Sequence, residues 1–221
     1  MGAPSAATTA PALTMRRRLR DRLVDVVARR PAGTFGRFLY RNPHSHFKSF
    51  EATLAVLELS SDDRLLEVGC GGGTFLALAL ASGCEAKAID HSTDMVSLAR
   101  QRNATACRAR RLEVIHARAE ELPFAAERFT CAAMTNAFFF LHDPARALQE
   151  LSRVLRPAGR LAIHTTAPDP PPWMAPPLIA QQMRFYTDEQ LHHMARAAGF
   201  IDVSIARLDR GHSQLLTATR P

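Results

Sequence analysis

The feature that most constrains the fold of this chain is a cluster of glycines directly behind an apolar run. The stretch LLEVGCGGGTF (Leu65–Phe75) places four glycines within five residues. The run before them is typical of a buried strand, and the apolar stretch after them is typical of a helix. Because glycine has no Cβ, such a junction can turn sharply and let a ligand lie against its backbone. A tight turn usually needs only one glycine, so the cluster favours a ligand-binding loop.

Strands and helices alternate along the rest of the chain. Strands are predicted at 64–69, 85–90, 111–117, 129–138, 160–166, 200–207 and 213–219. Helices are predicted at 50–59, 74–83, 92–102, 143–157 and 188–199. This alternation predicts an α/β fold with a doubly wound, mostly parallel, seven-stranded sheet. Ligands of such sheets bind at the carboxyl ends of the strands, where the glycine cluster is expected.

The positive charge of the chain is concentrated near its start. The chain has 28 basic and 21 acidic residues, and residues 1–41 hold nine arginines and two aspartates. The remainder is therefore neutral, whereas an enzyme that acts on nucleic acid would carry positive charge around its active site. We predict a disordered tail at 1–14, a basic helical arm or lid at 15–48, and the main domain at 49–221.

The arm carries an apolar face of its own. One side of the predicted helix carries Leu19, Leu23, Val26 and Val27, and arginines surround the rest. We expect this helix to pack on the main domain. Contact with an anionic partner or a membrane surface, and an organellar transit peptide, remain open as alternatives.

The cysteines indicate a reducing compartment. Cys70, Cys84, Cys107 and Cys131 show neither a CxxC pair nor a His/Cys cluster at metal spacing. We therefore expect free thiols, a cytoplasmic location and no metal site. No window approaches the eighteen apolar residues that a membrane-spanning helix needs.

Two ligand classes use a glycine loop of this kind. A dinucleotide requires G-x-G-x-x-G, and Thr74 stands where the third glycine would be. Asp90, about twenty residues further on, suits the ribose of either class. Glu67 discriminates between them, because a carboxylate beside the loop repels a pyrophosphate and attracts a cationic sulfonium ligand.

The motifs resemble those of class I S-adenosylmethionine-dependent methyltransferases. LLEVGCGGGTF resembles the first motif of that family, and AIDHSTDMVSLAR resembles the second. The segment from ARAEELPF to RLAI resembles the group of ubiquinone- and menaquinone-biosynthesis enzymes known as type 11. The similarity runs in order over roughly residues 35–166, so it implies a methyltransferase that uses S-adenosylmethionine.

The resemblance implies a set of cofactor-binding residues. They are Glu67, Gly69, Cys70, Gly71, Gly73, Asp90, His91, Met95, Ala119, Glu120 and Asn136. In this set the glycines lie beneath the methionine and ribose, Glu67 supports the loop and the amino group, and Asp90 accepts both ribose hydroxyls. Met95 packs near the adenine or is simply an apolar helix residue. The sequence departs from the family at Arg118, where an aspartate usually receives the adenine amino group, so adenine recognition depends on backbone groups or Glu120.

The acceptor pocket is expected above the strand ends. Its candidate residues are Phe139, Phe140, His164, Trp173 and Tyr186. Trp173 and Tyr186 belong to a proline-rich segment, 167–186, which is predicted to be an extended cover or a rigid crossover. Aromatic residues favour a hydrophobic or aromatic acceptor. No catalytic residue is assigned, because methyl transfer needs mainly alignment of donor and acceptor.

Two other functions remain open at this point. A binding protein that no longer transfers methyl groups fits the departure at Arg118. An RNA methyltransferase that uses the basic arm as a tether is disfavoured by the neutral main domain and by TNAFFF after the fourth strand, where an N-P-P-[FY] motif would stand.

Overall fold

The structure is a computed structural model that describes residues 47–175 and 177–221. The predicted tail at 1–14 and all but the last two residues of the predicted arm at 15–48 lie outside this part of the chain. The domain boundaries drawn from the sequence therefore stay predictions. Among the described residues, no helix has the length and apolar character needed to cross a membrane.

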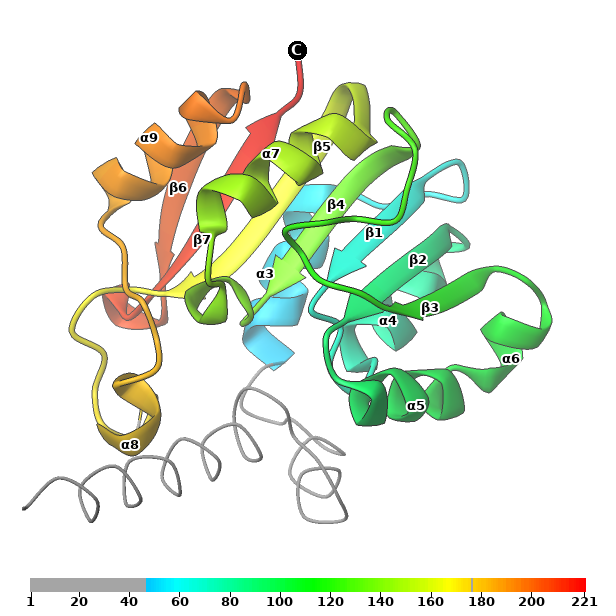
Figure 1. Cartoon of the computed structure of the whole chain (residues 1–221), viewed down its shortest axis with the longest axis horizontal. Helices are drawn as coiled ribbons and strands as arrows, with labels where there is room; N and C mark the ends of the chain where they lie inside the picture. The colour runs from blue at the N-terminus through cyan, green and yellow to red at the C-terminus, as the bar shows by residue number, and fades with distance from the viewer. Residues whose placement is uncertain (1–46, 176) are drawn as a thin grey trace, which may run out of the picture.

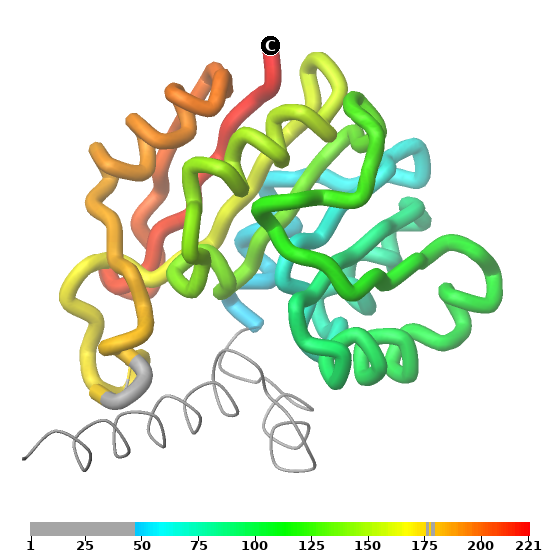
Figure 2. Tube along the Cα trace, viewed as in Figure 1, coloured from blue at the N-terminus to red at the C-terminus, as the bar shows by residue number. Residues whose placement is uncertain are grey.

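A seven-stranded sheet forms the centre of the molecule (Figures 1 and 2). The strands are β1 Arg64–Val68, β2 Glu85–Asp90, β3 Leu112–His116, β4 Phe129–Thr135, β5 Leu155–Thr166, β6 Ile201–Leu208 and β7 Ser213–Thr219. Their order is β3-β2-β1-β4-β5-β7-β6. The first five pair in parallel, and β7 runs antiparallel between β5 and β6. The predicted fold class is confirmed.

Helices cover both faces of this sheet. The α-helices are α3 Phe47–Leu57, α4 Thr74–Ala79, α5 Thr93–Arg102, α6 Ala104–Arg108, α7 Pro144–Val154, α8 Pro177–Ala180 and α9 Asp188–Ala197. Short 3-10 helices form at η3 Leu80–Ser82, η4 Phe138–Phe140 and η5 Asp209–Gly211. One core lies between the sheet and α7 with α9, and the other lies between the sheet and α3, α4 and α5. Figure 1 shows α7 in front of the sheet and α3 and α4 behind it.

Local signals set several of the helix starts. The Ser92 hydroxyl caps α5 by accepting from the Met95 N–H, and Asp143 caps α7 by accepting from the Arg146 N–H at 2.9 Å. Thr187 and Gln190 form a capping box at the start of α9. Side-chain oxygens of this kind satisfy backbone donors that the first turn of a helix leaves without partners.

The end of α7 was predicted wrongly. The sequence pattern extended this helix to Pro157, but it ends at Val154, and β5 begins at Leu155. The residues ahead of β4 hold the chain there, because the Glu127 and Arg128 N–H groups donate to the Arg153 and Val154 carbonyls at 3.0 and 2.8 Å. A tertiary contact thus ends the helix before the proline is reached.

Candidate cofactor and acceptor site

The glycine loop joins β1 to α4 and is held against its neighbours by close packing. Gly69 and Gly73 have φ of 76° and 75°, a left-handed conformation that favours glycine. A Cβ on Gly69 would stand 2.6 Å from the Ala137 Cβ, and one on Gly73 would stand 2.7 Å from Asn103 Nδ2. These two glycines therefore let the loop pack against the chain after β4 and against the end of α5. The sequence analysis missed this packing role, since the glycine cluster indicated only a sharp turn and the approach of a ligand.

The carboxylate of Asp90 ties the loop to the end of β2. Its Oδ2 accepts from the Gly71 N–H and its Oδ1 from the Ser92 N–H, both at 2.9 Å. The side chain is 6% exposed, and burial raises the pKa of this carboxyl above its usual value. His91 Nδ1 lies 3.6 Å from Asp90 Oδ1, and the His91 side chain is 43% exposed. An ionised carboxylate has about four acceptor positions, so Asp90 can still accept from a ligand diol.

Glu67 is a second buried carboxyl beneath the same loop. It is 1% exposed, and its Oε2 has no hydrogen-bond partner among the described residues. Burial, and after it the charge of Asp90, raises the pKa of Glu67 to about 8. A buried acceptor without a partner is costly, and a cationic ligand group would remove that cost. Glu67 and the glycine turns thus fit a ligand that carries both a sulfonium and an ammonium group.

The segment after β3 carries the predicted adenine contacts. Ala119 is 9% exposed, and the Glu120 carboxylate pairs with Arg118 Nε at 3.5 Å. The Glu120 carboxylate, which was expected to help recognise adenine in place of the aspartate missing at position 118, is thus paired with Arg118 itself. Met95 is 1% exposed, so its side chain packs in the protein interior in this structure. Cys70 is also buried, and its N–H donates to the Ile89 carbonyl at 3.0 Å.

At the ends of β4 and β5, Asn136 links three elements. Its Oδ1 lies 3.0 Å from His164 Nδ1, and its Nδ2 donates to the Ser49 hydroxyl of α3 at 2.9 Å. Because the amide nitrogen donates to Ser49, the oxygen accepts, and this places a proton on His164 Nδ1. Asn136 has φ of 56°, which asparagine tolerates better than most residues. No sequence signal pointed to Ser49, since it lies 87 positions away.

Aromatic residues follow Asn136 directly. In η4, Phe138 and Phe139 are buried and Phe140 is half-buried. The Phe138 ring meets the Tyr186 ring at 5.7 Å, and the Phe139 ring meets that of Phe140 at 4.7 Å. The end of the proline-rich segment is pinned here, because the Arg184 N–H donates to the Phe139 carbonyl at 2.8 Å.

Trp173 lies apart from this aromatic group. Its side chain is 73% exposed, and its ring meets that of His212, at the end of η5, at 6.4 Å. The structure thus gathers most predicted residues at the carboxyl ends of β1, β2, β4 and β5, but it does not bring Trp173 to them. Within residues 47–175 and 177–221, no group of three His, Cys, Asp or Glu side chains is arranged to hold a metal.

The strand order, the glycine loop after β1 and the acid that closes β2 together define a class of enzyme. The protein is a class I S-adenosylmethionine-dependent methyltransferase. Residues 66–163 match the family model described as "Methyltransferase domain". S-adenosylmethionine is accordingly its methyl donor.

Three known proteins illustrate the relationship. A demethylmenaquinone methyltransferase of Clavibacter sepedonicus is 28% identical over 195 residues, 77% of this chain and 78% of that protein. A malonyl-[acyl-carrier protein] O-methyltransferase of Enterobacter lignolyticus is 33% identical over 122 residues, 55% of this chain and 46% of that protein. The fold resembles that of geranyl diphosphate C-methyltransferase from Streptomyces coelicolor bound to S-adenosyl-L-homocysteine, with a TM-score of 0.67, 15% identity, and coverage of 79% of each chain.

Proposed function

We propose that this enzyme transfers the methyl group of S-adenosylmethionine to a hydrophobic or aromatic small molecule. The observation that carries the proposal is the aromatic group at η4, which directly follows Asn136 at the carboxyl edge of the sheet. Apolar and aromatic side chains line most small-molecule sites. A relative that methylates demethylmenaquinone supports the same class of acceptor.

The cofactor roles of the individual residues are part of this proposal. Gly69, Gly71 and Gly73 would shape the floor, Asp90 would accept from the ribose hydroxyls, and Glu67 would face the ammonium group. The backbone of Ala119 and Glu120 would border the adenine, and Met95 would pack near it. Support comes from the buried carboxyls of Glu67 and Asp90, which both lie beside the glycine loop. The Gly71 N–H of this loop donates a hydrogen bond to the Asp90 carboxylate.

The acceptor side would be formed by several elements. Phe140 and Tyr186 lie near the end of β4, and Asn136 holds His164 in one orientation. The segment 167–186 would form part of the cover, with Trp173 at its outer margin. The arm at 15–48 would close the site from the other side, since α3 begins at the carboxyl edge of the sheet (Figure 1).

The chemistry asks little of the protein beyond alignment. The sulfonium of the cofactor supplies an activated methyl group with a good leaving group. Orientation of two bound reactants can lower a barrier by about 7–11 kcal/mol. A base is required only where the acceptor atom must lose a proton. His164, whose Nδ1 is held by Asn136, is the candidate for that role with a hydroxyl acceptor.

Four free cysteines within the described residues support a reducing compartment, so we also propose a cytoplasmic location. Contact of the basic arm with a membrane surface stays a prediction about residues outside the described part.

The test is a transfer assay with methyl-labelled S-adenosylmethionine. The purified full chain is incubated with panels of reduced quinones, phenols and lipids, and the Asp90→Ala variant serves as the cofactor-binding control. We expect label in an aromatic or apolar product with the wild type and a large loss with the variant. Label that enters only RNA, or no label despite measured cofactor binding, contradicts the proposed acceptor class.

A further inference from the structure

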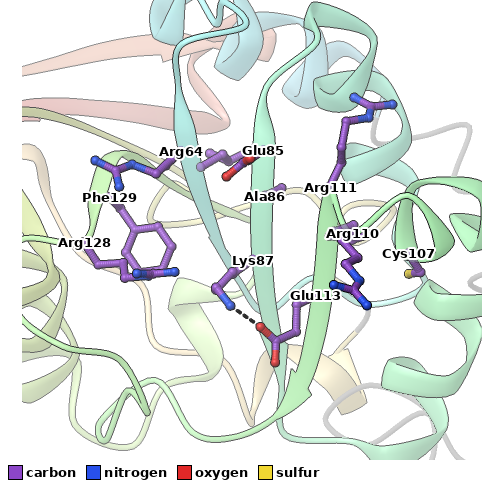
Figure 3. A pocket seen from close by; sticks show the side chains of 12 residues that line it. Arg64, Glu85, Ala86, Lys87, Cys107, Arg110, Arg111, Glu113, Arg128 and Phe129 are labelled. Carbon is purple, nitrogen blue, oxygen red and sulfur yellow. Dashed lines mark hydrogen bonds and ion pairs between the residues drawn. The ribbon is translucent and has the colours of Figure 1, made fainter.

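The face of the sheet over β2 and β3 carries charges where a parallel sheet is normally apolar. Parallel strands are usually covered on both faces and read as continuous apolar runs. Here Lys87 of β2 and Glu113 of β3 are register partners, and their side chains form an ion pair on the same face. The connection between β3 and β4, residues 117–128, contains no helix that would cover this face. The charges therefore border an open groove (Figure 3).

The groove has the size of a small-molecule site. Its volume is about 410 Å³, within the range of roughly 300–1,000 Å³ found for ligand pockets. It lies at the amino ends of the strands, because Arg64 is the first residue of β1 and Glu85 the first residue of β2. The cofactor loop lies at the opposite end of β1, so about 15 Å of strand separates the two places.

Cations dominate the lining of this groove. Five basic side chains and two carboxylates line it, although residues 42–221 as a whole carry no net charge. Lys87 pairs with Glu113, and Arg111 donates to the Leu80 carbonyl. Arg64, Arg110 and Arg128 form no ion pair with any described residue.

These three guanidiniums flank the groove. Figure 3 shows Arg64 and Arg128 on one side of the Lys87–Glu113 pair and Arg110 on the other. A planar guanidinium donates two parallel hydrogen bonds to phosphate or carboxylate oxygens. Three such groups around one pocket suit an anion of more than one charge, and this favours phosphate over a single carboxylate.

We propose that this groove binds a phosphate-bearing small molecule, at a site separate from that of the cofactor and the acceptor. Arg110 and Arg128 would contact the phosphate oxygens from opposite sides. Glu113 would keep Lys87 directed into the groove. The proposal is independent of the acceptor, because none of these residues lies at the carboxyl edge of the sheet.

The test uses inorganic pyrophosphate as the probe and the amide NMR spectrum of the ¹⁵N-labelled full chain as the readout. We expect saturable shifts at residues 85–87, 110–113 and 128, and no comparable shifts with sodium chloride at the same ionic strength. Each of the substitutions Arg110→Gln and Arg128→Gln should weaken binding about tenfold. Arg210→Gln is the matched control. Arg210 is an exposed arginine of η5, between β6 and β7 at the other edge of the sheet, and it forms no ion pair with a described residue.

Unfolding midpoints and cofactor affinity establish that each variant folds as the wild type does. The proposal is overturned if the shifts are unsaturable, are reproduced by chloride, or are confined to residues 1–46. It is equally overturned if Arg210→Gln weakens binding as much as the groove variants do. If a single-stranded RNA shifts the same amides and pyrophosphate does not, the groove binds nucleic acid and the proposed small-molecule ligand is wrong.

Discussion

Asn136 Oδ1 and His164 Nδ1 meet at 3.0 Å, and the backbone N–H of Asn136 donates to the His164 carbonyl at the same distance. Two hydrogen bonds thus join the ends of neighbouring parallel strands, while the Asn136 amide nitrogen reaches Ser49 on α3. One side chain thereby positions α3, β4 and β5 around the proposed acceptor side.

Removal of this side chain should loosen the site and the fold together. We expect Asn136→Ala to lower the free energy of unfolding by about 2–3 kcal/mol, because the partly buried groups of Ser49 and His164 lose partners. Ser49→Ala removes only one of the links and should cost about 1 kcal/mol. Urea denaturation measures both values, and equal costs for the two variants would show that the His164 link contributes nothing.

Asp90 should affect cofactor affinity and stability at once. Asp90→Ala should weaken S-adenosylmethionine binding by about 1.5–3 kcal/mol, the contribution of hydrogen bonds to a charged group. It should also lower the melting temperature, because the Gly71 and Ser92 N–H groups lose their acceptor. Calorimetry and thermal unfolding test the two effects, with the exposed Asp62→Ala as control. Unchanged affinity would place the ribose elsewhere.

Glu67 should make stability depend on pH. Its pKa is about 8 in the folded protein, against 4.5 for the free side chain. The folded state therefore holds a proton that the unfolded state has lost, and stability falls as pH rises from about 4.5 to 8. Glu67→Gln should flatten this fall, as urea titrations at pH 5, 6.5 and 8 would show. A slope identical to that of the wild type would contradict the raised pKa.

The same proton should couple to the cofactor. If the ammonium group binds beside Glu67, binding favours the carboxylate and releases up to about one proton near pH 7. Calorimetry in two buffers of different ionisation enthalpy measures this release. Glu67→Gln should abolish it, and release that persists in the variant would assign the proton to another group.

The substitutions Gly73→Ala and Gly211→Ala form a matched pair that tests how tightly the glycine loop packs at Gly73. Both have positive φ, 75° and 93°. A Cβ at Gly73 meets Asn103 and Ala99 at 2.7–2.9 Å, whereas a Cβ at Gly211 meets nothing within 4 Å. Gly211→Ala should therefore cost only the backbone strain, about 1–2 kcal/mol, and Gly73→Ala a further 1–3 kcal/mol for overpacking. Similar losses in the free energy of unfolding for the two substitutions would contradict the packing role of Gly73.

Truncation tests the arm. Deletion of residues 1–14 should leave cofactor binding and turnover intact, since this segment has little to bury. Deletion through Arg30 should impair acceptor turnover more than cofactor affinity, because the apolar face that carries Leu19, Leu23, Val26 and Val27 is lost. The contrary result is a longer deletion that leaves small-molecule turnover intact and abolishes salt-dependent RNA binding. That result would refute the arm's role as a lid over the site and support its role as a tether for RNA.

Much of the fold followed from local patterns. All seven strands were predicted in the right order, and six of them within three residues at each end, since short apolar runs between turn residues are local signals. The exception is β5, which begins five residues before its predicted start. The caps at Ser92 and Asp143 are equally local, because each joins residues three positions apart. Asp90 could be placed beside the glycine loop because the carboxyl ends of neighbouring parallel strands meet at one edge.

Contacts between distant segments decided the rest. The end of α7 depends on backbone bonds to the residues ahead of β4, and the exposure of Trp173 depends on the path of the proline-rich segment after β5. The packing glycines and the link from Ser49 to Asn136 likewise join positions 26 or more residues apart. The sequence by itself determined the order of the elements and the edge of the sheet where the glycine loop and Asp90 lie, since periodicity and turn chemistry are local. Only the tertiary structure decided which side chains meet there and which face stays open, because both depend on packing between elements that no local pattern records.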